Sequence, residues 1–492
     1  MRLRLAVVVA FVSGFVALSY EIQWYRAISF VSGGLPAAFG LLLGAYLGGL
    51  AVGALACEFY CRDRRSDSVR LASVGAFMFC ANVCGFLVLP ALAWLTPLEL
   101  SVGPILVKWG LVFPLVSLAA AMMGAVLPLI AHFGIEPDSR AGARLSYLYL
   151  ANILGSSAGS LVTGLLFMER WSTATTSLVT ACIGVCTAAA LGSLGGRFVR
   201  SLTRVWLPAA GFVALLVAAV PGWFRNWHAR LLFESEWRSA DPITAVIENR
   251  HGIIVMTEDK TVFGGGAYDG IAEVDLLRDR NGITRAYAVA ALHPAPRDVL
   301  LIGLSGGAWA NVLANLPGVE RLTVVEINPG YLRLVRSVPE MGRILDHPRV
   351  EIVIDDGRRW LARHPERRFD VVVSNTTFHW RAHATNLLSR EFMELVRSRL
   401  RPGGVFYFNT TDSWDAYRTA FETFRYGMRV SNFASVSDRP LDFDTLQWRS
   451  VMQSALSSVP PNNALSAEEK EQRLIDLMRW PERATEGKDR QN

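Results

Sequence analysis

Charged residues are scarce in this chain of 492 residues. Asp, Glu, Lys and Arg together make up 19% of it, whereas hydrophobic residues make up 51%. This balance is atypical of a wholly soluble protein and indicates that part of the chain lies in a membrane. The net charge of +6 could indicate a nucleic acid partner, but much of the excess lies in short loops between apolar segments. We therefore expect no nucleic acid partner.

Cysteine is absent after residue 186. The six cysteines form three pairs with a spacing of four residues, which are Cys57/Cys61, Cys80/Cys84 and Cys182/Cys186. This spacing places both thiols of a pair on one face of a helix, whereas a zinc site needs about four ligands gathered in space. We interpret the cysteines as small residues that pack between helices, and we expect no metal site.

Long apolar runs are confined to the first half of the chain. Seven runs have the length of a membrane span, and they cover residues 5–31, 35–56, 71–95, 109–132, 147–168, 172–194 and 205–222. We expect residues 1–223 to form a polytopic α-helical domain of six or seven spans, with the lipid bilayer as its partner. Glycines mark the expected close contacts between helices, namely Gly44, Gly48, Gly49, Gly53, Gly155 and Gly159.

Three polar residues lie within these runs. Glu21 and Arg26 lie near the end of the first run, and Asn152 lies early in the fifth. They could line a path for a solute, or they could form a structural ion pair and a helix–helix hydrogen bond. The sequence leaves both interpretations open.

Loop charges predict the orientation of the spans. Arginines cluster in three alternate loops, at residues 62–70, 140–144 and 197–204, so the amino terminus and these loops should face the cytoplasm. Seven true spans would then place everything after residue 223 outside the cell, away from nucleotide cofactors. We therefore expect that residues 205–222 do not cross the membrane and that residues 224–492 are cytoplasmic.

Residues 224–283 are expected to form a connector and a small β-domain. Short β-type runs occur at Thr244–Glu248, Gly252–Thr257, Thr261–Phe263 and Glu273–Leu277. The glycine-rich turn between the last two runs contains Tyr268 and Asp269. This turn could close over a ligand as a lid, or its glycines could simply form a tight hairpin.

Residues 284–455 alternate between apolar strands and helical segments, which predicts an α/β Rossmann-like sheet. The strand Asp298–Ile302 breaks into a turn with Gly303, Gly306 and Gly307, and the next strand ends on Glu326. Glycines let the backbone approach a nucleotide closely, and an acid at this place accepts hydrogen bonds from ribose hydroxyls. The pattern therefore predicts a nucleotide site.

Polar residues also follow the next two expected strands. Val350–Ile354 is followed by Asp355, Asp356 and Gly357, and the strand after it is followed by Asn375. Because ligands bind at the carboxyl ends of parallel strands, we expect these residues to lie near the same site.

These motifs resemble the membrane-fused bacterial branch of the spermidine synthases (polyamine aminopropyltransferases). The matching runs are FVSGFVALSYEIQWYRAIS, YLYLANILGSSAGSLVTG, VLLIGLSGG, VVEINP, IDDG and LLSREFMELVRSRLRPGGVF. The resemblance implies a class I AdoMet-type fold after a β-hairpin domain, in a multi-pass protein of a bacterial-type inner membrane. It also implies AdoMet or decarboxylated AdoMet as ligand, with Glu326 on the ribose and Asp355 or Asp356 on the adenine side.

The polyamine half of the site departs from the family pattern. The family has an acid where this chain has Gly306, and further acids where it reads Asn375 to Phe378. Those acids hold the cationic substrate and activate its amine, which Asn, Gly and Phe cannot do. The chain instead offers His379 and His383 as bases and Arg381 as an anion clamp. These side chains could equally cap a helix, bond to backbone or pack.

We therefore expect a membrane-anchored, spermidine synthase-like transferase that acts on a small-molecule acceptor other than the usual diamine. Asn375, His379 and His383 are its candidate catalytic residues. One alternative is a non-catalytic nucleotide-sensing domain that regulates a transport-like membrane segment, and another is an ordinary spermidine synthase. A homo-oligomer is compatible with the sequence. The charged stretch 456–492 is expected to be disordered.

Overall fold

The chain divides into two compact units. The computed structural model describes residues 3–61, 67–98, 104–193, 202–375, 378–382, 384–458, 466–478 and 488–489. The first unit comprises Met1–Pro242 together with Glu248–Gly252, and the second comprises Ile243–Ile247 together with Ile253–Asn492. The tip of one β-hairpin therefore belongs to the first unit.

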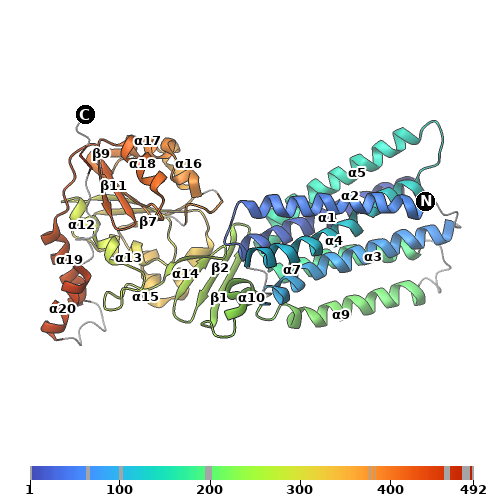
Figure 1. The fold of residues 1–492 in the computed structure, drawn as a ribbon, viewed down its shortest axis with the longest axis horizontal. Helices are drawn as coiled ribbons and strands as arrows, with labels where there is room; N and C mark the ends of the chain where they lie inside the picture. The colour runs from blue at the N-terminus through green and yellow to red at the C-terminus, as the bar shows by residue number, and fades with distance from the viewer. Residues whose placement is uncertain are drawn as a thin grey trace. The chain divides into compact units, whose positions relative to one another are not determined.

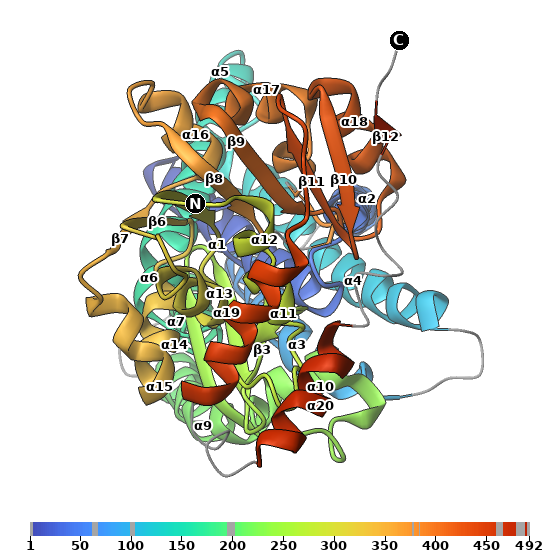
Figure 2. The same cartoon turned by 90° about the vertical axis from the view of Figure 1, so that its left-hand side faces the viewer.

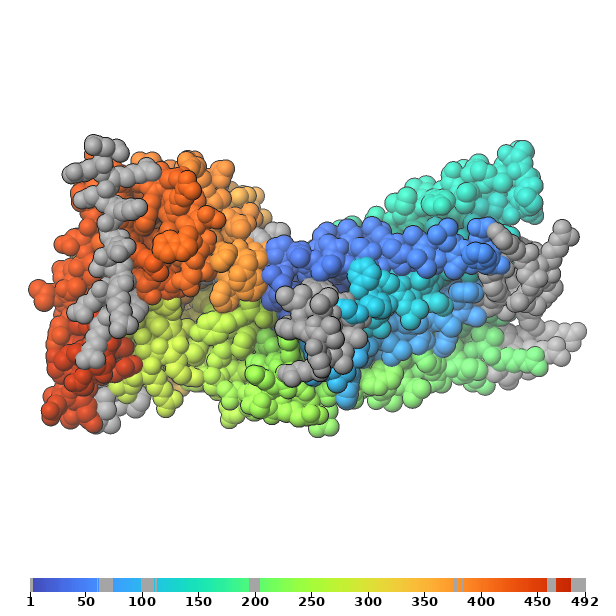
Figure 3. All heavy atoms as spheres, viewed as in Figure 1, coloured from blue at the N-terminus to red at the C-terminus, as the bar shows by residue number. Residues whose placement is uncertain are grey.

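Long apolar helices make up most of the first unit (Figures 1 and 3). They are α1 (Leu3–Val31), α2 (Ala37–Cys61), α3 (Asp67–Leu95), α4 (Pro104–Gly134), α5 (Ala141–Leu161), α7 (Thr173–Ser193) and α9 (Leu207–Trp223). Short helical segments continue or follow them, namely η1 (Val162–Phe167), α6 (Met168–Arg170), η2 (Leu202–Trp206), α10 (Trp227–Phe233) and η3 (Glu234–Glu236). Seven helices in the described part of the chain could each cross a membrane by length and composition, which confirms the seven predicted runs. A helix satisfies its own backbone hydrogen bonds, as an apolar segment away from water must.

The glycines of α2 divide into two kinds. A Cβ atom built on Gly49 or Gly53 would collide with backbone carbonyls of α4, so these glycines permit the close approach of the two helices. A Cβ atom on Gly44 or Gly48 would meet nothing within 4 Å. The prediction of close contacts is therefore confirmed for the first pair and wrong for the second, because α4 follows only one face of α2.

Helices α1 and α5 also pack through glycines. Gly155 and Gly159 face backbone carbonyls of α1, where a Cβ atom would not fit. Beside them, the Asn152 side-chain amide donates a hydrogen bond of 3.2 Å to the carbonyl of Ala10. Asn152 thus forms the helix–helix hydrogen bond that was one of its two expected roles.

A buried ionic cluster lies within the first unit. Glu248 accepts hydrogen bonds from the Thr173 amide at 2.8 Å and from its hydroxyl at 2.5 Å. Arg26 lies 3.4 Å and His228 lies 3.1 Å from the same carboxylate. Burial opposes ionisation of Glu248, but the bonds and charges of His228, Arg26 and Thr173 outweigh it and lower the pKa to about 2. Arg26 therefore forms a structural ion pair, and its partner is Glu248.

A small sheet begins the second unit. Its strands are β1 (Ile243–Asn249), β2 (Gly252–Thr257), β3 (Thr261–Gly264) and β4 (Ala267–Ile271), in that spatial order. The expected strand Glu273–Leu277 is wrong. Only Gly265 and Gly266 form the turn, both with positive φ, so the chain returns earlier than predicted and β4 pairs with β3.

The large sheet is mixed and has the order β12-β10-β11-β9-β8-β5-β6-β7 (Figure 2). Its parallel strands are β5 (Asp298–Ile302), β6 (Arg321–Glu326), β7 (Val350–Ile354), β8 (Phe369–Ser374) and β9 (Leu400–Asn409). The antiparallel strands are β10 (Tyr426–Val430), β11 (Phe433–Ser437) and β12 (Lys488–Asp489). This arrangement confirms the predicted Rossmann-like fold.

Helices and two hydrophobic cores accompany this sheet. The helical segments are α11 (Thr284–Tyr287), α12 (Val289–Leu292), α13 (Ala308–Ala314), α14 (Gly330–Ser337), α15 (Pro339–Gly342), η4 (Arg343–Asp346), α16 (Gly357–Arg363), η5 (Ala384–Leu387), α17 (Arg390–Arg399), α18 (Trp414–Thr423), α19 (Thr445–Ser458) and α20 (Ala467–Met478). Successive residues of β5 enter different cores, because Val299 and Leu301 lie in one and Leu300 and Ile302 in the other. The central strand is therefore buried on both faces, as its unbroken apolar sequence predicts.

The expectation of a disordered tail is wrong for residues 467–478, which form α20. Leu474 and Leu477 are buried in the same core as Val299. The signal was present in the sequence, because Ser466 and Glu469 bond each other's backbone amides in a capping box.

Candidate functional site

The register of the parallel strands brings the predicted nucleotide residues together. Ile302 of β5 pairs with Val325 of β6 on one side and with Ser374 of β8 on the other. The residues that follow them are Gly303, Glu326 and Asn375, so these three lie at one edge of the sheet. The end of β7 joins the same edge, because the Asp355 amide donates a bond of 3.1 Å to the Glu326 carbonyl.

Glu326 is the best defined acid at this edge. Its side chain is buried and accepts backbone hydrogen bonds from Leu304 at 2.7 Å and from Asn328 at 2.8 Å. Burial, above all, raises the pKa of Glu326 to about 7, and the nearby Asp269 adds to this rise, while the two amides oppose it. The carboxylate is thus fixed at the glycine turn in the place predicted for a ribose-binding acid.

The three glycines of the turn serve different needs. Gly303 and Gly307 have φ values of 93° and 82°, which side chains other than glycine rarely adopt. Gly306 is restricted by space instead, since a Cβ atom on it would lie 2.9 Å from the Cα of Ala272. An acidic side chain at this position would therefore have no room without a shift of the backbone at Ala272.

The two acids after β7 have distinct roles. Asp356 caps α16 by accepting a bond of 2.8 Å from the Arg359 amide. Asp355 accepts bonds from the Asp356 amide and from the Arg359 side chain. Burial opposes ionisation of Asp355, but the bonds from Arg359 and the amide outweigh it, so its pKa is lowered. Asp355 is therefore held in an ion pair with Arg359, and Asp356 is a helix cap.

Two exposed aliphatic side chains lie next to these acids. Ile327 follows Glu326 and is 55% exposed, and Ile354 precedes Asp355 and is 43% exposed. The neighbouring Gly357 packs against Ile302, which a Cβ atom would approach to 2.8 Å. An open apolar surface beside a buried carboxylate suits a planar base attached to a ribose.

Strand β4, and not the turn before it, contributes Asp269 to the site. Its side chain accepts a hydrogen bond from the Tyr331 hydroxyl, and its carbonyl accepts one from the Ser305 hydroxyl in the glycine turn. Burial raises the pKa of Asp269, while the Tyr331 bond and the positive charge of Arg381 oppose this rise. Sequence reasoning named Asp269 but missed Tyr331, which carries no spacing signal because its partner is 62 residues away. Tyr268 instead is exposed and donates to Asn281 at 3.3 Å.

Asn375 belongs to a network of side-chain amides. Its Oδ1 accepts a bond of 3.1 Å from Asn409 Nδ2. Asn409 Oδ1 accepts from the Thr411 amide at 2.8 Å and from Asn432 Nδ2 at 2.9 Å. The chain ends at Arg285, whose Nη1 donates to Asn432 Oδ1 at 2.8 Å. Sequence reasoning found only Asn375, because the other members come from distant segments.

Residues 378–382 of the segment that follows Asn375 are described, and they include His379 and Arg381. His379 bonds Thr411 through its amide and its Nδ1, both at 2.9 Å from Thr411 Oγ1, so any proton transfer by this ring would use Nε2. Arg381 Nη2 donates a bond of 2.8 Å to the carbonyl of Gly264. Phe378 and Trp380 stack with ring centroids 5.2 Å apart. His383 lies outside the described residues.

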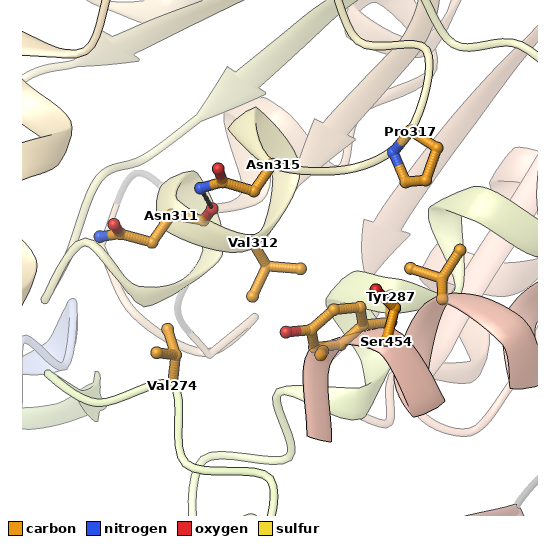
Figure 4. A pocket seen from close by; sticks show the side chains of 9 residues that line it. Val274, Tyr287, Asn311, Val312, Asn315, Pro317 and Ser454 are labelled. Atoms are coloured by element: carbon orange, nitrogen blue, oxygen red, sulfur yellow. Dashed lines mark hydrogen bonds between the residues drawn. The ribbon is translucent and has the colours of Figure 1, made fainter. Parts of the chain in front are cut away.

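Two cavities among the described residues of the second unit are lined by none of the predicted site residues. One of about 440 Å³ is lined by Val274, Tyr287, Asn311, Val312, Asn315 and Pro317, with Val451, Ser454 and Ala455 of α19 (Figure 4). None of these side chains is charged. Within the part of the chain that the structure describes, no group of three or more His, Cys, Asp or Glu residues could hold a metal ion.

Comparisons with known proteins found similarities in a family model, in curated relatives and in a solved structure. The family model described as "Spermine/spermidine synthase domain" matches residues 286–429. A polyamine aminopropyltransferase of Mycobacterium tuberculosis is 25% identical over 405 residues, which cover 79% of this chain and 73% of that protein. Polyamine aminopropyltransferase 2 of Streptomyces coelicolor is 29% identical over 337 residues, which cover 65% of this chain and 58% of the relative. A solved spermidine synthase in complex with the transition state analogue AdoDATO has 20% identity and a TM-score of 0.34, over 40% of this chain and 74% of its own.

The match to the family model lies within the predicted Rossmann-like domain. The resemblance drawn from the sequence motifs is thereby confirmed for these residues, which follow seven apolar helices in the described part of the chain.

Proposed function

We propose that this chain is a membrane-anchored transferase whose second unit binds AdoMet or decarboxylated AdoMet by its nucleoside. The observation that carries the proposal is the Glu326 carboxylate, buried and fixed by two backbone amides beside the glycine turn. Each carboxylate oxygen keeps a further lone pair with which it can accept a ribose hydroxyl. Ile327 and Ile354 would cover the faces of the adenine, and Asp355 would lie at its polar edge.

We further propose that the acceptor is a small molecule other than the usual diamine. A diammonium substrate needs carboxylates, but Gly306 and Asn375 stand at two of the expected acids, and the space at Gly306 is filled by Ala272. His379 is then the candidate base, acting through Nε2, and Asn375 is a candidate for positioning the acceptor. His383 remains a candidate on its sequence position alone.

The proposed location is a bacterial-type inner membrane, with the first six apolar helices across the lipid bilayer and the second unit in the cytoplasm. Residues 205–222 would then lie in the interface or re-enter rather than span. A reporter fused after residue 455 should be active when it requires the cytoplasm. Activity only of a reporter that requires the outside would contradict this location.

Calorimetry with the full chain in detergent tests the nucleoside site, with methylthioadenosine as the probe. Glu326→Ala removes two hydrogen bonds to a buried carboxylate, worth on the order of 2–4 kcal/mol, so binding should weaken at least about 30-fold. Glu320→Ala is the matched control, because its carboxylate is 70% exposed and lies outside the site. Unchanged binding by the Glu326 variant, or no binding of methylthioadenosine, AdoMet and decarboxylated AdoMet by the wild type, would refute the proposal.

A further inference from the structure

One cavity of the second unit is separate from the nucleoside site, because none of the residues named for that site lines it. Its wall is formed by α13 and the residues that follow, by Tyr287 of α11, by Val274 and by α19 (Figure 4). Its volume of about 440 Å³ falls in the range of pockets that hold small organic molecules. An occupant of this cavity would therefore be a second ligand.

Much of this wall is apolar and belongs to a hydrophobic core. Val312 and Val451 are 4% and 7% exposed, and both lie in the same core as Tyr287. Val274 and Ala455 pack against that core. Side chains packed in this way present an apolar surface of fixed shape. Such a surface suits an apolar ring and offers no partner to a charge.

Tyr287 supplies a polar group at this wall. The residue is 8% exposed, and Figure 4 shows its hydroxyl directed toward Val312 and Val274. Burial, above all, and the charge of Asp279 raise the pKa of Tyr287 to about 12, so the hydroxyl is neutral. No hydrogen bond within the described part of the chain engages this hydroxyl. It is therefore available to a ligand.

Asn311 gives the wall a second polar group and connects it to the glycine turn. Its Nδ2 donates to the carbonyls of Gly307 at 2.9 Å and of Met341 at 3.5 Å. A carbonyl can only accept, so the amide nitrogen faces the backbone and Oδ1 remains an acceptor. The Tyr287 oxygen can accept as well. These polar groups therefore suit an N–H or O–H group of a ligand.

We propose that this cavity binds a small uncharged ring compound that carries an N–H or O–H group. The ring packs against Val274, Val312 and Val451, and the donor bonds the Tyr287 oxygen. This site does not depend on the proposed nucleoside site at Glu326. Its occupant would contact α13, the helix that begins directly after Gly307 of the glycine turn.

Indole is the probe for this cavity, because it is an apolar ring with one N–H donor and no charge. Indene lacks the N–H group, and indole-2-carboxylate carries a charge beside it. Calorimetry on the full chain in detergent should show that indole binds at least about 3-fold more tightly than indene. Indole-2-carboxylate should bind at least about 10-fold more weakly than indole, because its charge finds no partner. Tyr287→Phe should remove the preference for indole over indene and leave indene binding within about twofold.

Two variants of α19 assign the binding to the cavity. Ala455→Phe adds a ring at a lining position and should weaken indole binding at least about 10-fold. Ser457→Phe adds similar bulk at an exposed position that does not line the cavity, and should leave the affinity within about twofold. The same detergent concentration in all samples keeps the uptake of indole by micelles equal.

Three results would overturn the inference. They are equal affinity of the wild type for indole and indene, an unchanged affinity for indole in Ala455→Phe, and displacement of indole by methylthioadenosine. No binding of indole by a wild type that binds methylthioadenosine would also overturn it, and would leave the nucleoside site intact.

Discussion

The candidate site has two halves that are held together in different ways. We call the residues around Glu326 the nucleoside half and those around Asn375 the acceptor half. The nucleoside half is built from backbone and short-range contacts, with Glu326 held by the amides of Leu304 and Asn328. The acceptor half is built from side chains of distant segments, with Asn375 linked through Asn409 and Asn432 to Arg285. The first half holds a buried acid, whereas the second holds side-chain amides and no acid among Asn375, Asn409 and Asn432.

The two halves differ in what holds their residues in place. Strand register fixes Gly303 and Glu326 at the ends of β5 and β6, so these two residues stay together as long as the sheet does. The residues after β8 are fixed only by their own side-chain partners, so substitution there alters charge without altering the sheet. The comparison would fail if the acceptor half still accepts a diamine substrate, or if the nucleoside half does not bind a nucleoside.

The largest effect is expected in aminopropyl transfer to putrescine. General-base assistance contributes roughly 10²–10⁴-fold, and Asn375 cannot take a proton. From decarboxylated AdoMet and putrescine, the chain should form spermidine at least about 100-fold more slowly than the M. tuberculosis relative under the same conditions. Product formation followed by chromatography measures this.

The variant Asn375→Asp tests whether the missing carboxylate is the cause of the slow spermidine formation. It should raise the slow rate, because a carboxylate would stand where the amine must be held, whereas Asn315→Asp adds the same charge at an exposed position and should not. Spermidine formation by the wild type at the rate of the relative would show that the acceptor half is conventional, and the ordinary spermidine synthase function would stand.

A smaller effect is expected from pH on methylthioadenosine binding. The pKa of Glu326 is raised to about 7, and the carboxyl must be ionised to accept two ribose hydroxyls. Affinity should therefore rise about tenfold per pH unit below pH 7 and level off above it, with proton release on binding. Calorimetry in two buffers of different ionisation enthalpy measures both quantities. Glu326→Gln should remove most of the dependence, and a residual slope would be assigned to Asp269.

The stability of the protein without ligand should change with pH in the opposite direction to its affinity, and fall as the pH rises. A carboxyl whose pKa is higher in the folded state than the usual value of about 4.3 binds more protons when folded. The contribution of Glu326 is therefore most favourable below that value and is lost as the pH rises toward about 7. Thermal unfolding measured across this pH window tests the raised pKa of Glu326. A Tm that rises with pH, with the same pH dependence in Glu326→Gln, would contradict it.

The sequence predicted the nucleoside half because its signals are local. A strand, a glycine turn, a helix and a strand that ends on Glu326 form one continuous pattern, and β5 and β7 have the predicted limits. Asp356 was assigned to the adenine side, although an Asp three residues before Arg359 at a helix start is also the pattern of a cap, which the structure shows. Local patterns thus predicted the strands at whose ends the candidate residues lie, and they left the role of one acid ambiguous.

The acceptor half could not be predicted in the same way. Arg285 and Asn432 are 147 residues apart, and Tyr331 and Asp269 are 62 apart, so no spacing rule connects them. The sequence showed that acids were missing at Gly306 and Asn375, but not that Ala272 occupies the space beside Gly306. A sequence shows that an acid is missing at a given position. It does not show which atoms occupy the space that the acid would need, because tertiary packing determines them.

The smallest effect, and the last test of the comparison, concerns Gly306→Asp in the full chain. A Cβ atom there would lie 2.9 Å from the Cα of Ala272, so the backbone after β4 would have to move. Overpacking of this kind costs about 1–3 kcal/mol, which lowers Tm by several degrees for a domain of this size. Gly342→Asp is the matched control, because its nearest neighbours lie at ordinary contact distance, 3.4 Å, and its φ is −59°. A Gly306 variant that is as stable as this control and also accelerates spermidine formation would mean that the acid fits after all. The acceptor half would then be only a few substitutions from the diamine-binding form, and its difference from the nucleoside half would lie in charge and not in shape.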